Sequence, residues 1–251
     1  MKPVHTPAPG NGELLVLQGV NAWYGAAHIL HDVDLQVGRG EVVALMGRNG
    51  AGKSTTLKSI MGLEAARRGA IRFSGHDIAT LAPYQVARLG LGYVPEDRRL
   101  FTELTVQENL ETGRQPGRVR QDGAAAPVWD HNAVFRLFPV LETMRNRPAG
   151  AMSGGEQQML TVARTLMGNP LLLLLDEPSE GVAPVIVEQM ARMILDVKSR
   201  GVSVLLSEQN VSFAAMVADR AYILEKGSVR YHGTMAEVAS SEALRRDYLA
   251  V

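Results

Sequence analysis

Short apolar runs alternate along the chain with segments whose apolar positions recur at helical spacing. Three runs, at residues 42–46, 171–175 and 202–206, are apolar with Ser203 as the one exception, which is typical of strands buried on both faces of a parallel sheet. Between them, residues 159–166 and 186–197 place their apolar side chains on one face of a helix. The alternation predicts an α/β protein with a mainly parallel sheet.

The beginning of the chain follows a different pattern. Residues 1–12 carry prolines and glycines without an apolar segment, which predicts a flexible tail rather than a targeting signal. Residues 14–18 and 33–37 have strand character and are separated by a turn-rich stretch that shows no helical period. We therefore expect an antiparallel element beside the parallel core.

The strand signals fade between about residues 97 and 165. Helical segments at 106–111 and 132–142 flank a stretch at 113–126 that is rich in Gly, Ala and Arg and is typical of a surface loop. Because no internal repeat is visible, we expect one domain over residues 13–251 with a helical subdomain inserted over 97–165.

Composition narrows the function classes. The 251 residues include no cysteine, so a disulfide framework, a thiol nucleophile and a cysteine-based zinc site are excluded. The 26 basic and 26 acidic side chains balance, which argues against a broad nucleic-acid footprint. The longest stretch without a charged side chain, residues 14–31, contains glycines and histidines and does not predict a membrane span. We expect a cytoplasmic protein whose membrane role, if any, depends on partners.

A glycine-rich loop follows the first apolar run. Residues 47–55 read GRNGAGKST and fit the pattern G-x-x-x-x-G-K-[ST] between a predicted strand and a predicted helix. Such glycines let the backbone curl around phosphates, Lys53 would reach the β- and γ-phosphates, and Ser54 would bind Mg²⁺. A glycine-rich turn with a chance lysine is the alternative. The predicted phosphate-binding residues are Gly47, Arg48, Asn49, Gly50, Ala51, Gly52, Lys53, Ser54 and Thr55.

Two carboxylates end the second apolar run, where residues 171–177 read LLLLLDE. Ligands of α/β folds bind at the carboxyl edge of the sheet. Asp176 is a candidate to hold Mg²⁺ through water, and Glu177 is a candidate to polarise the water that attacks the γ-phosphate. A strand that ends in a solvated turn is the alternative, but the phosphate loop upstream favours the functional interpretation.

A second candidate anion site begins at residue 152, where the chain reads MSGGEQQ. Ser153, Gly154 and Gly155 offer a hydroxyl and bare backbone amides at a positive helix end, followed by Glu156. The alternative interpretation is a helix N-cap with an early acidic residue. One phosphate loop does not need this second site.

Together these motifs resemble those of ATP-binding cassette proteins over nearly the whole chain after the tail. The resemblance implies that Tyr24 stacks on adenine, that Glu96 stands at the glutamine-loop position, and that Gln209 stands at the switch-histidine position. It also implies that residues 153–156 of one subunit close on the ATP held by another, so two cassettes enclose two nucleotides. Residues 179–181 would form the contact loop between subunits.

Glu96 and Gln209 depart from the general cassette pattern. In that family the first position touches Mg²⁺ and the lytic water and the second contacts the γ-phosphate, so the changes could indicate a weak ATPase. The same pair of changes is familiar in LivF-type ATPases of branched-chain amino acid importers, which makes them a character of that branch. Asp97 and Glu180 depart from the commoner Gly and Leu of the branch. The stretches that carry this narrower resemblance are residues 93–96, 153–160, 208–210 and 218–227.

The resemblance implies an ATPase at the cytoplasmic face of the inner membrane. It would bind ATP and Mg²⁺ and power two separate membrane subunits, with a solute-binding protein that delivers branched-chain or other hydrophobic amino acids. Its ATPase partner would be a LivG-type subunit or a second copy of the chain. Another cargo, such as urea, an aromatic acid or an exported lipid, remains open, as does a weakly hydrolysing, nucleotide-gated subunit. Binding to nucleic acid is not expected.

Overall fold

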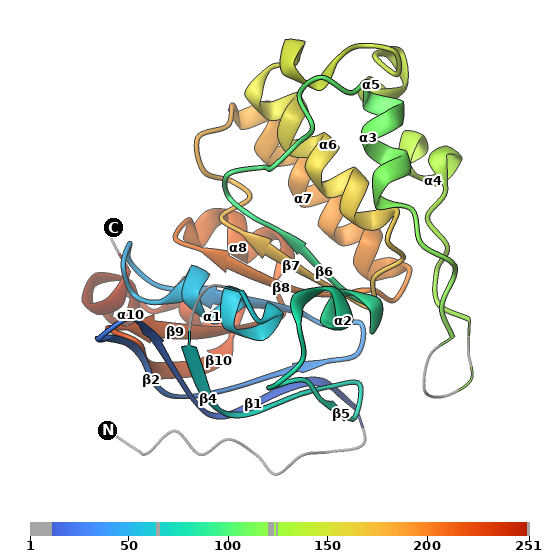
Figure 1. Ribbon diagram of the computed structural model, residues 1–251. Coiled ribbons are helices and arrows are strands. Elements are labelled where there is room, and N and C mark those ends of the chain that lie inside the picture. The colour runs from blue at the N-terminus through green and yellow to red at the C-terminus, as the bar shows by residue number, and fades with distance from the viewer. Residues whose placement is uncertain (1–11, 64–65, 120–122, 124, 250–251) are drawn as a thin grey trace.

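A computed structural model of the chain describes residues 12–63, 66–119, 123 and 125–249 (Figure 1). Two sheets form its centre. The larger has the strand order β10-β9-β3-β8-β7-β6, and the smaller has the order β2-β1-β4-β5. The predicted tail lies outside the described residues except for Gly12, and the predicted domain limits, 13–251 and 97–165, stay predictions.

The larger sheet contains the strands that the apolar runs predict. Neighbouring strands from β9 to β6 are parallel, and only β10 runs antiparallel, against β9. Every residue of β3, β7 and β8 is buried, as continuous apolar runs require. The bounds are β3 Val42–Met46, β6 Leu91–Val94, β7 Leu172–Asp176, β8 Ser203–Glu208, β9 Arg220–Glu225 and β10 Ser228–Thr234.

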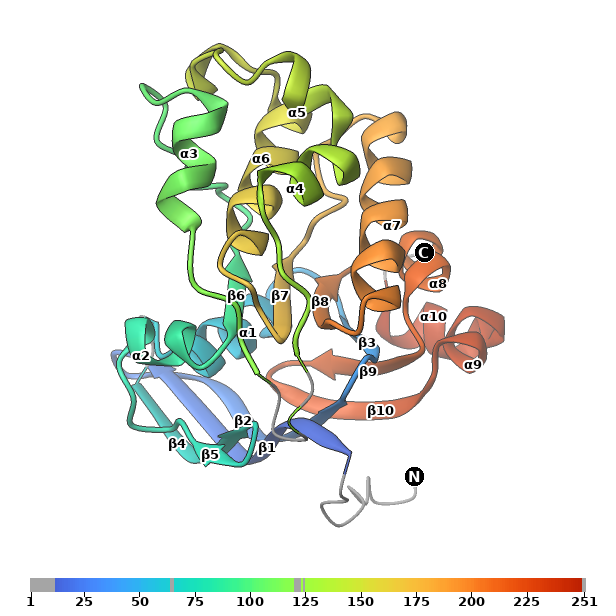
Figure 2. The same cartoon turned by 90° about the vertical axis from the view of Figure 1, so that its right-hand side faces the viewer.

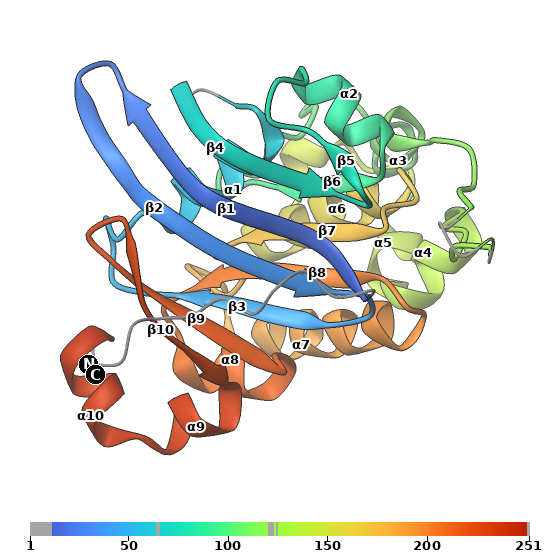
Figure 3. The ribbon, with the colours of Figure 1, turned by 90° about the horizontal axis from the view of Figure 1, so that it is seen from below.

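The antiparallel element is present but larger than expected. The stretch between the two predicted strands is not a long turn, because β1 (Glu13–Tyr24) and β2 (Ala27–Gly38) are separated by only a short hairpin turn. Gly19, at a φ of 57°, lies where the pairing register between β1 and β2 shifts. The strand therefore continues through residues that interrupt its apolar pattern. The sheet also contains β4 (Ala66–Phe73) and β5 (His76–Asp77) (Figure 3).

Helices α3 to α6 gather beyond the ends of β6 and β7 (Figure 2). The predicted helix at 132–142 is broken at Phe138, because Pro139 disfavours a helical conformation in the residue before it. The helices are α1 Lys53–Met61, α2 Pro83–Arg88, α3 Val106–Gly113, α4 His131–Leu137, α5 Pro139–Thr143, α6 Gly154–Leu166, α7 Pro184–Ser199, α8 Val211–Val217, α9 Met235–Ser240 and α10 Glu242–Tyr248, with a 3₁₀ turn at Ala149–Ala151.

Two apolar cores lie on opposite faces of the larger sheet. Val42, Ala44 and Met46 of β3 point into the core shared with α6 and α7. The alternate residues Val43 and Leu45 point into the core shared with α1 and the antiparallel sheet. Because both faces of the sheet are buried, the sheet holds the loops at its carboxyl edge in place, and these loops carry the candidate functional residues. In the part of the chain that the structure describes, no helix has the length and apolar character to span a membrane.

Candidate nucleotide-binding site

The loop between β3 and α1 depends on glycine. Gly50 and Gly52 have φ values of 78° and 106°, in the left-handed region that favours glycine. A Cβ atom on Gly52 would lie 2.8 Å from Leu30 Cδ2, so a side chain there would collide with the core. Gly52 also provides no side-chain cap for α1. The first backbone amides of α1 are therefore left for an anion at the positive helix end.

Lys53 extends into this loop and is only 3% exposed. Its ammonium donates to the carbonyls of Gly47 and Arg48 at 2.9 and 3.2 Å. It also forms an ion pair with the Glu177 carboxylate, at 3.0 Å between Nζ and Oε1. The loop thus directs one buried positive charge at the carboxyl edge of the sheet.

Asp176 meets the predicted partner Ser54 at this edge. The Ser54 hydroxyl donates to Asp176 Oδ1 at 2.9 Å, and the Ser207 hydroxyl donates to the same oxygen at 2.6 Å. The Tyr93 hydroxyl donates to Oδ2 at 3.1 Å. The sequence analysis gives neither Ser207 nor Tyr93 a role, although Tyr93 begins the stretch 93–96 and Ser207 lies between the run 202–206 and the stretch 208–210. Ser207 pairs with Asp176 in the register of β7 and β8, which the sequence does not reveal.

Glu177 follows Asp176 in a strained backbone conformation. Its φ of 47° is unusual for a residue other than glycine, and such strain concentrates at functional positions. Gln209 Nε2 donates to Glu177 Oε2 at 3.4 Å, so two predicted residues meet. Burial alone would raise the pKa of the Glu177 carboxyl, but hydrogen bonds with Glu180, Lys53 and Gln209 and the charge of Lys53 lower it overall.

Further carboxylates surround this pair. The hydrogen bond between Glu180 and Glu177, together with burial and the neighbouring negative charges of Glu96 and Glu208, raises the pKa of Glu180 to about 7. Glu208 is 2% exposed and accepts backbone amides at both oxygens, which anchors the turn that carries Gln209. Burial still raises the pKa of Glu208. The departure at Glu180 thus brings a second, titratable carboxyl to the candidate base.

A cavity of about 480 Å³ opens over these groups. Tyr24, at the end of β1 and 37% exposed, lines one side, and Glu96 lines it from the loop after β6. The other predicted residues that line it are Asn49, Gly50, Gly52, Lys53, Ser54, Thr55 and Glu177. The remaining residues of the glycine loop lie elsewhere: Ala51 is buried, and Arg48 donates to the carbonyl of Arg246 in α10.

The residues at 153–156 are absent from the described lining of this cavity. Ser153 and Glu156 form a capping box at the start of α6, with Ser153 N donating to Glu156 Oε2 at 2.7 Å. A Cβ on Gly155 would lie 2.7 Å from Ile186 Cγ1. Within one chain, therefore, the motif caps a helix and packs on α7.

The loop that begins at Glu96 connects the cavity to the helical part. Arg98 and Arg99 both have positive φ values, 62° and 46°. Their carbonyls accept hydrogen bonds from Thr161 and Arg164 of α6, at 3.1 and 2.7 Å. Two hydrogen bonds therefore connect α6 to the loop that carries Glu96.

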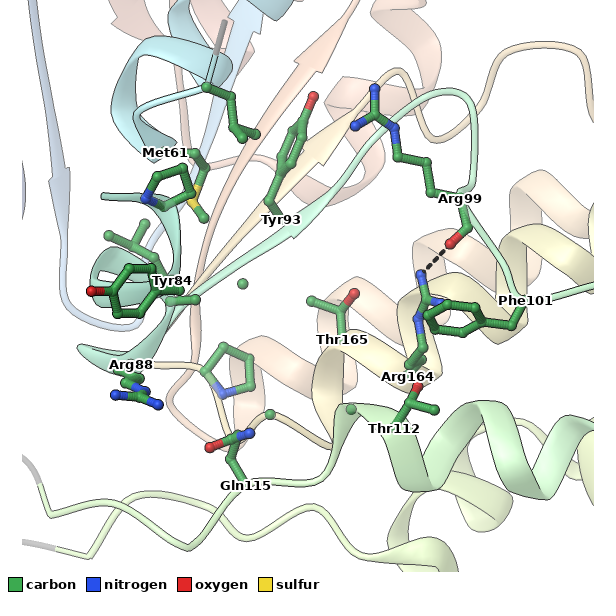
Figure 4. A pocket seen from close by; sticks show the side chains of 18 residues that line it. Met61, Tyr84, Arg88, Tyr93, Arg99, Phe101, Thr112, Gln115, Arg164 and Thr165 are labelled. Carbon is green, nitrogen blue, oxygen red and sulfur yellow. Dashed lines mark hydrogen bonds between the residues drawn. The ribbon is translucent and has the colours of Figure 1, made fainter. Parts of the chain in front are cut away.

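A larger cavity, about 670 Å³, lies between α2, β6 and the helices α3 and α6 (Figure 4). Two aromatic side chains in it are strongly exposed, Tyr84 at 61% and Phe101 at 54%. Arg164 lies over the Phe101 ring, with the guanidinium carbon 5.5 Å from the ring centre. Tyr93 lines the same groove from β6. We refer to it below as the aromatic groove.

The donor chemistry at Asp176 fits Mg²⁺. Among the described residues, no group of three or more His, Cys, Asp or Glu side chains could hold a metal ion by itself. The Ser54 hydroxyl and the Asp176 carboxylate present two oxygen donors beside the phosphate loop, and Mg²⁺ is usually held by one or two protein oxygens together with water and phosphate. The residues therefore suit a metal that arrives with a nucleotide.

The glycine loop, the buried lysine and the paired carboxylates at the edge of a parallel sheet define a P-loop nucleotide-binding protein. The family model described as ABC transporter matches residues 30–180. The chain belongs to this family and is one of its ATPases. The α/β fold with its antiparallel element and helical part, predicted from the sequence, is thereby confirmed.

Curated relatives match over most of their length. The chain is 42% identical over 241 residues to the high-affinity branched-chain amino acid transport ATP-binding protein BraG of Pseudomonas aeruginosa, covering 94% of the chain and 99% of the relative. It is 36% identical to the lipopolysaccharide export system ATP-binding protein LptB of Escherichia coli, covering 90% and 92%. A solved ATP-binding subunit of an ABC transporter superposes with a TM-score of 0.75 at 30% identity, covering 94% and 95%. The resemblance to ATPases of branched-chain amino acid importers is confirmed.

Proposed function

We propose that this chain hydrolyses Mg-ATP to power an importer for branched-chain or other hydrophobic amino acids. The observation that carries the proposal is one cavity lined by Tyr24, Lys53, Ser54 and Glu177, where Lys53 pairs with Glu177 and Ser54 donates to Asp176 behind it. The BraG relative supports the cargo class. The protein would act at the cytoplasmic face of the inner membrane, bound to separate membrane subunits.

Binding of ATP would rearrange the ion pair of Lys53. The phosphates would replace Glu177 beside the ammonium, while the amides of the first turn of α1 donate to them. Tyr24 would stack on the base. Ser54, Asp176 and Glu96 would hold Mg²⁺, which when bound neutralises charge on the phosphates.

Glu177 would then act as the general base. Its pKa lies below the ordinary value, so the carboxylate is ionised at neutral pH and is able to accept a proton. Water oxygen bonds to the γ-phosphorus, the bond from that phosphorus to the bridging oxygen breaks, and the water proton passes to Glu177. Gln209 would contact the γ-phosphate from the same side. It donates a hydrogen bond but brings no positive charge.

A second cassette would complete the site. Residues 153–156 do not line the cavity of their own chain, which supports their use on the nucleotide of a partner, either a related ATPase or a second copy. The membrane subunits would dock on the aromatic groove, whose exposed Tyr84 and Phe101 are suited to burial. A solute-binding protein would deliver the cargo to those subunits.

The LptB relative favours a second candidate, an ATPase for lipid export. The departures at Glu96 and Gln209 favour a third, a subunit that gates on nucleotide with little hydrolysis of its own. Vesicles that contain the chain with its co-purified membrane subunits separate them. The importer predicts ATP-dependent uptake of leucine and stimulated hydrolysis. Extraction of lipid without uptake of leucine would favour the lipid exporter. Binding of ATP without hydrolysis would favour the nucleotide-gated subunit.

A further inference from the structure

Tyr93 joins the aromatic groove to the candidate metal site. The residue lies on β6, next to β7 in the sheet, and its side chain is half-buried. Its ring forms part of the groove wall (Figure 4). Its hydroxyl donates to Asp176 Oδ2 at 3.1 Å. Tyr93 is thus a groove-lining side chain that reaches Asp176, whereas the side chains of Thr165 and Arg164 in the same groove bond to backbone carbonyls.

The hydrogen bonds at Asp176 are unequal. Both serine hydroxyls, from Ser54 and Ser207, donate to Oδ1. Among the described residues, Tyr93 alone donates to Oδ2. A carboxylate can rotate about the bond that joins it to Cβ. The two serine hydroxyls hold Oδ1, and the Tyr93 hydroxyl holds Oδ2. The Tyr93 hydroxyl therefore fixes the rotation of the group.

The hydrogen bond from Tyr93 has a charged acceptor. The hydroxyl donates to the Asp176 carboxylate, a group that is only 2% exposed. A hydrogen bond to a charged acceptor is stronger than one between neutral groups.

We propose that Tyr93 is a positioning residue that orients the Asp176 carboxylate for Mg-nucleotide. The proposal rests on the function above, in which Asp176 helps to hold Mg²⁺. Loss of the hydroxyl leaves Asp176 Oδ2, a buried carboxylate oxygen, without its donor, so that the carboxylate is held at Oδ1 only. The contacts of the phosphates with Lys53 and with the first turn of α1 do not involve Tyr93. Tyr93 thus acts on the metal-dependent part of nucleotide binding alone.

Tyr93→Phe tests this, with Tyr84→Phe as the matched control. Tyr84 lines the same groove, and no side-chain hydrogen bond involves its hydroxyl among the described residues. A fluorescent ATP analogue is titrated in EDTA and then at increasing free Mg²⁺. For Tyr93→Phe we expect unchanged affinity in EDTA and an approximately tenfold higher Mg²⁺ concentration at half-maximal tightening, about the effect of one hydrogen bond to a charged group. Tyr84→Phe should match the wild type in this titration, because the proposed role of Tyr84 is in contacts with the membrane subunits and not in nucleotide binding.

Two results overturn the proposal. If Tyr93→Phe and the wild type show the same Mg²⁺ dependence, Tyr93 has no positioning role. If Tyr93→Phe loses as much affinity for the nucleotide in EDTA as in Mg²⁺, the effect is merely structural. If the wild type shows Mg²⁺-dependent tightening, a failure concerns Tyr93 alone; if it shows none, the proposed function fails as well.

A fluorine probe covers the case in which Tyr93→Phe does not fold. 3-Fluorotyrosine is incorporated at position 93 or, as control, at position 84. The resonance at position 93 should shift when Mg²⁺ is added to the nucleotide-bound protein, and the resonance at position 84 should not. A stationary resonance at position 93 would contradict the proposal.

Discussion

Lys53→Met isolates the energetics of one buried ion pair. Lys53 and Glu177 are 3% and 8% exposed, and Nζ lies 3.0 Å from Oε1. At an effective dielectric constant of ~20 their attraction is about 5.5 kcal/mol before the cost of desolvation is counted. Methionine leaves the carboxylate buried without its cation. We therefore expect the free energy of unfolding at pH 7 to fall by about 3 kcal/mol.

The reverse deletion should cost less. Glu177→Gln leaves the Lys53 ammonium with the carbonyls of Gly47 and Arg48, so we expect a loss of about 1 kcal/mol. The double variant should lose about 2 kcal/mol, less than the sum of about 4 kcal/mol, which gives a coupling energy of about 2 kcal/mol. Urea unfolding of the wild type, the two single variants and the double variant, all without nucleotide, measures the three losses and hence the coupling energy.

The same pair predicts a dependence on pH. The pKa of Glu177 is lower in the folded protein than its ordinary value, so the stabilisation is present above about pH 4.5 and is lost as pH falls through the lowered pKa. The deficit of Lys53→Met should therefore shrink between pH 7 and pH 4, since the protonated Glu177 no longer needs a cation. Additive losses in the cycle, or a deficit that is the same at both pH values, would refute the reasoning.

Two further predictions concern neighbouring residues. The pKa of Glu180 is raised to about 7, so the folded protein holds an extra proton between pH 4.5 and 7 and loses stability as pH rises through that window. The loss should be about 1 kcal/mol, because solvent screens the exposed side chain. Glu180→Gln should remove most of this loss, as measured by urea unfolding between pH 4.5 and 7. A pH profile identical to that of the wild type would contradict the prediction. Gly227 has a φ of 78°, and its amide donates to the Ala51 carbonyl. A Cβ at this position would collide with the Ile29 carbonyl, so Gly227→Ala should lower the melting temperature by several degrees and weaken ATP binding. Gly123 has open space around it, so Gly123→Ala should leave ATP binding unchanged.

The elements that the sequence predicts best are those with one unambiguous pattern. The runs in β3, β7 and β8 are predominantly apolar because both faces of the sheet are covered, and the phosphate loop combines residue type with spacing. β4 escaped prediction because Arg67, Arg68 and Arg72 interrupt its apolar alternation, while pairing with β1 still satisfies its backbone.

The candidate site was predictable where chemistry lies in one segment and not where it depends on register. Lys53, Ser54, Asp176 and Glu177 could be assigned from their motifs. The contact between Asp176 and Ser207 arises only because β7 and β8 pair in this register, and strand pairing is a property of the whole sheet.

ATP turnover by the wild type and by Glu177→Gln, with ATP binding measured in the same samples, tests the central claim most directly. If Glu177 accepts the proton of the attacking water, the variant binds ATP but does not turn it over, because glutamine cannot take up that proton. Substantial hydrolysis by the variant, at a rate near that of the wild type, would contradict the assignment of Glu177 as the base.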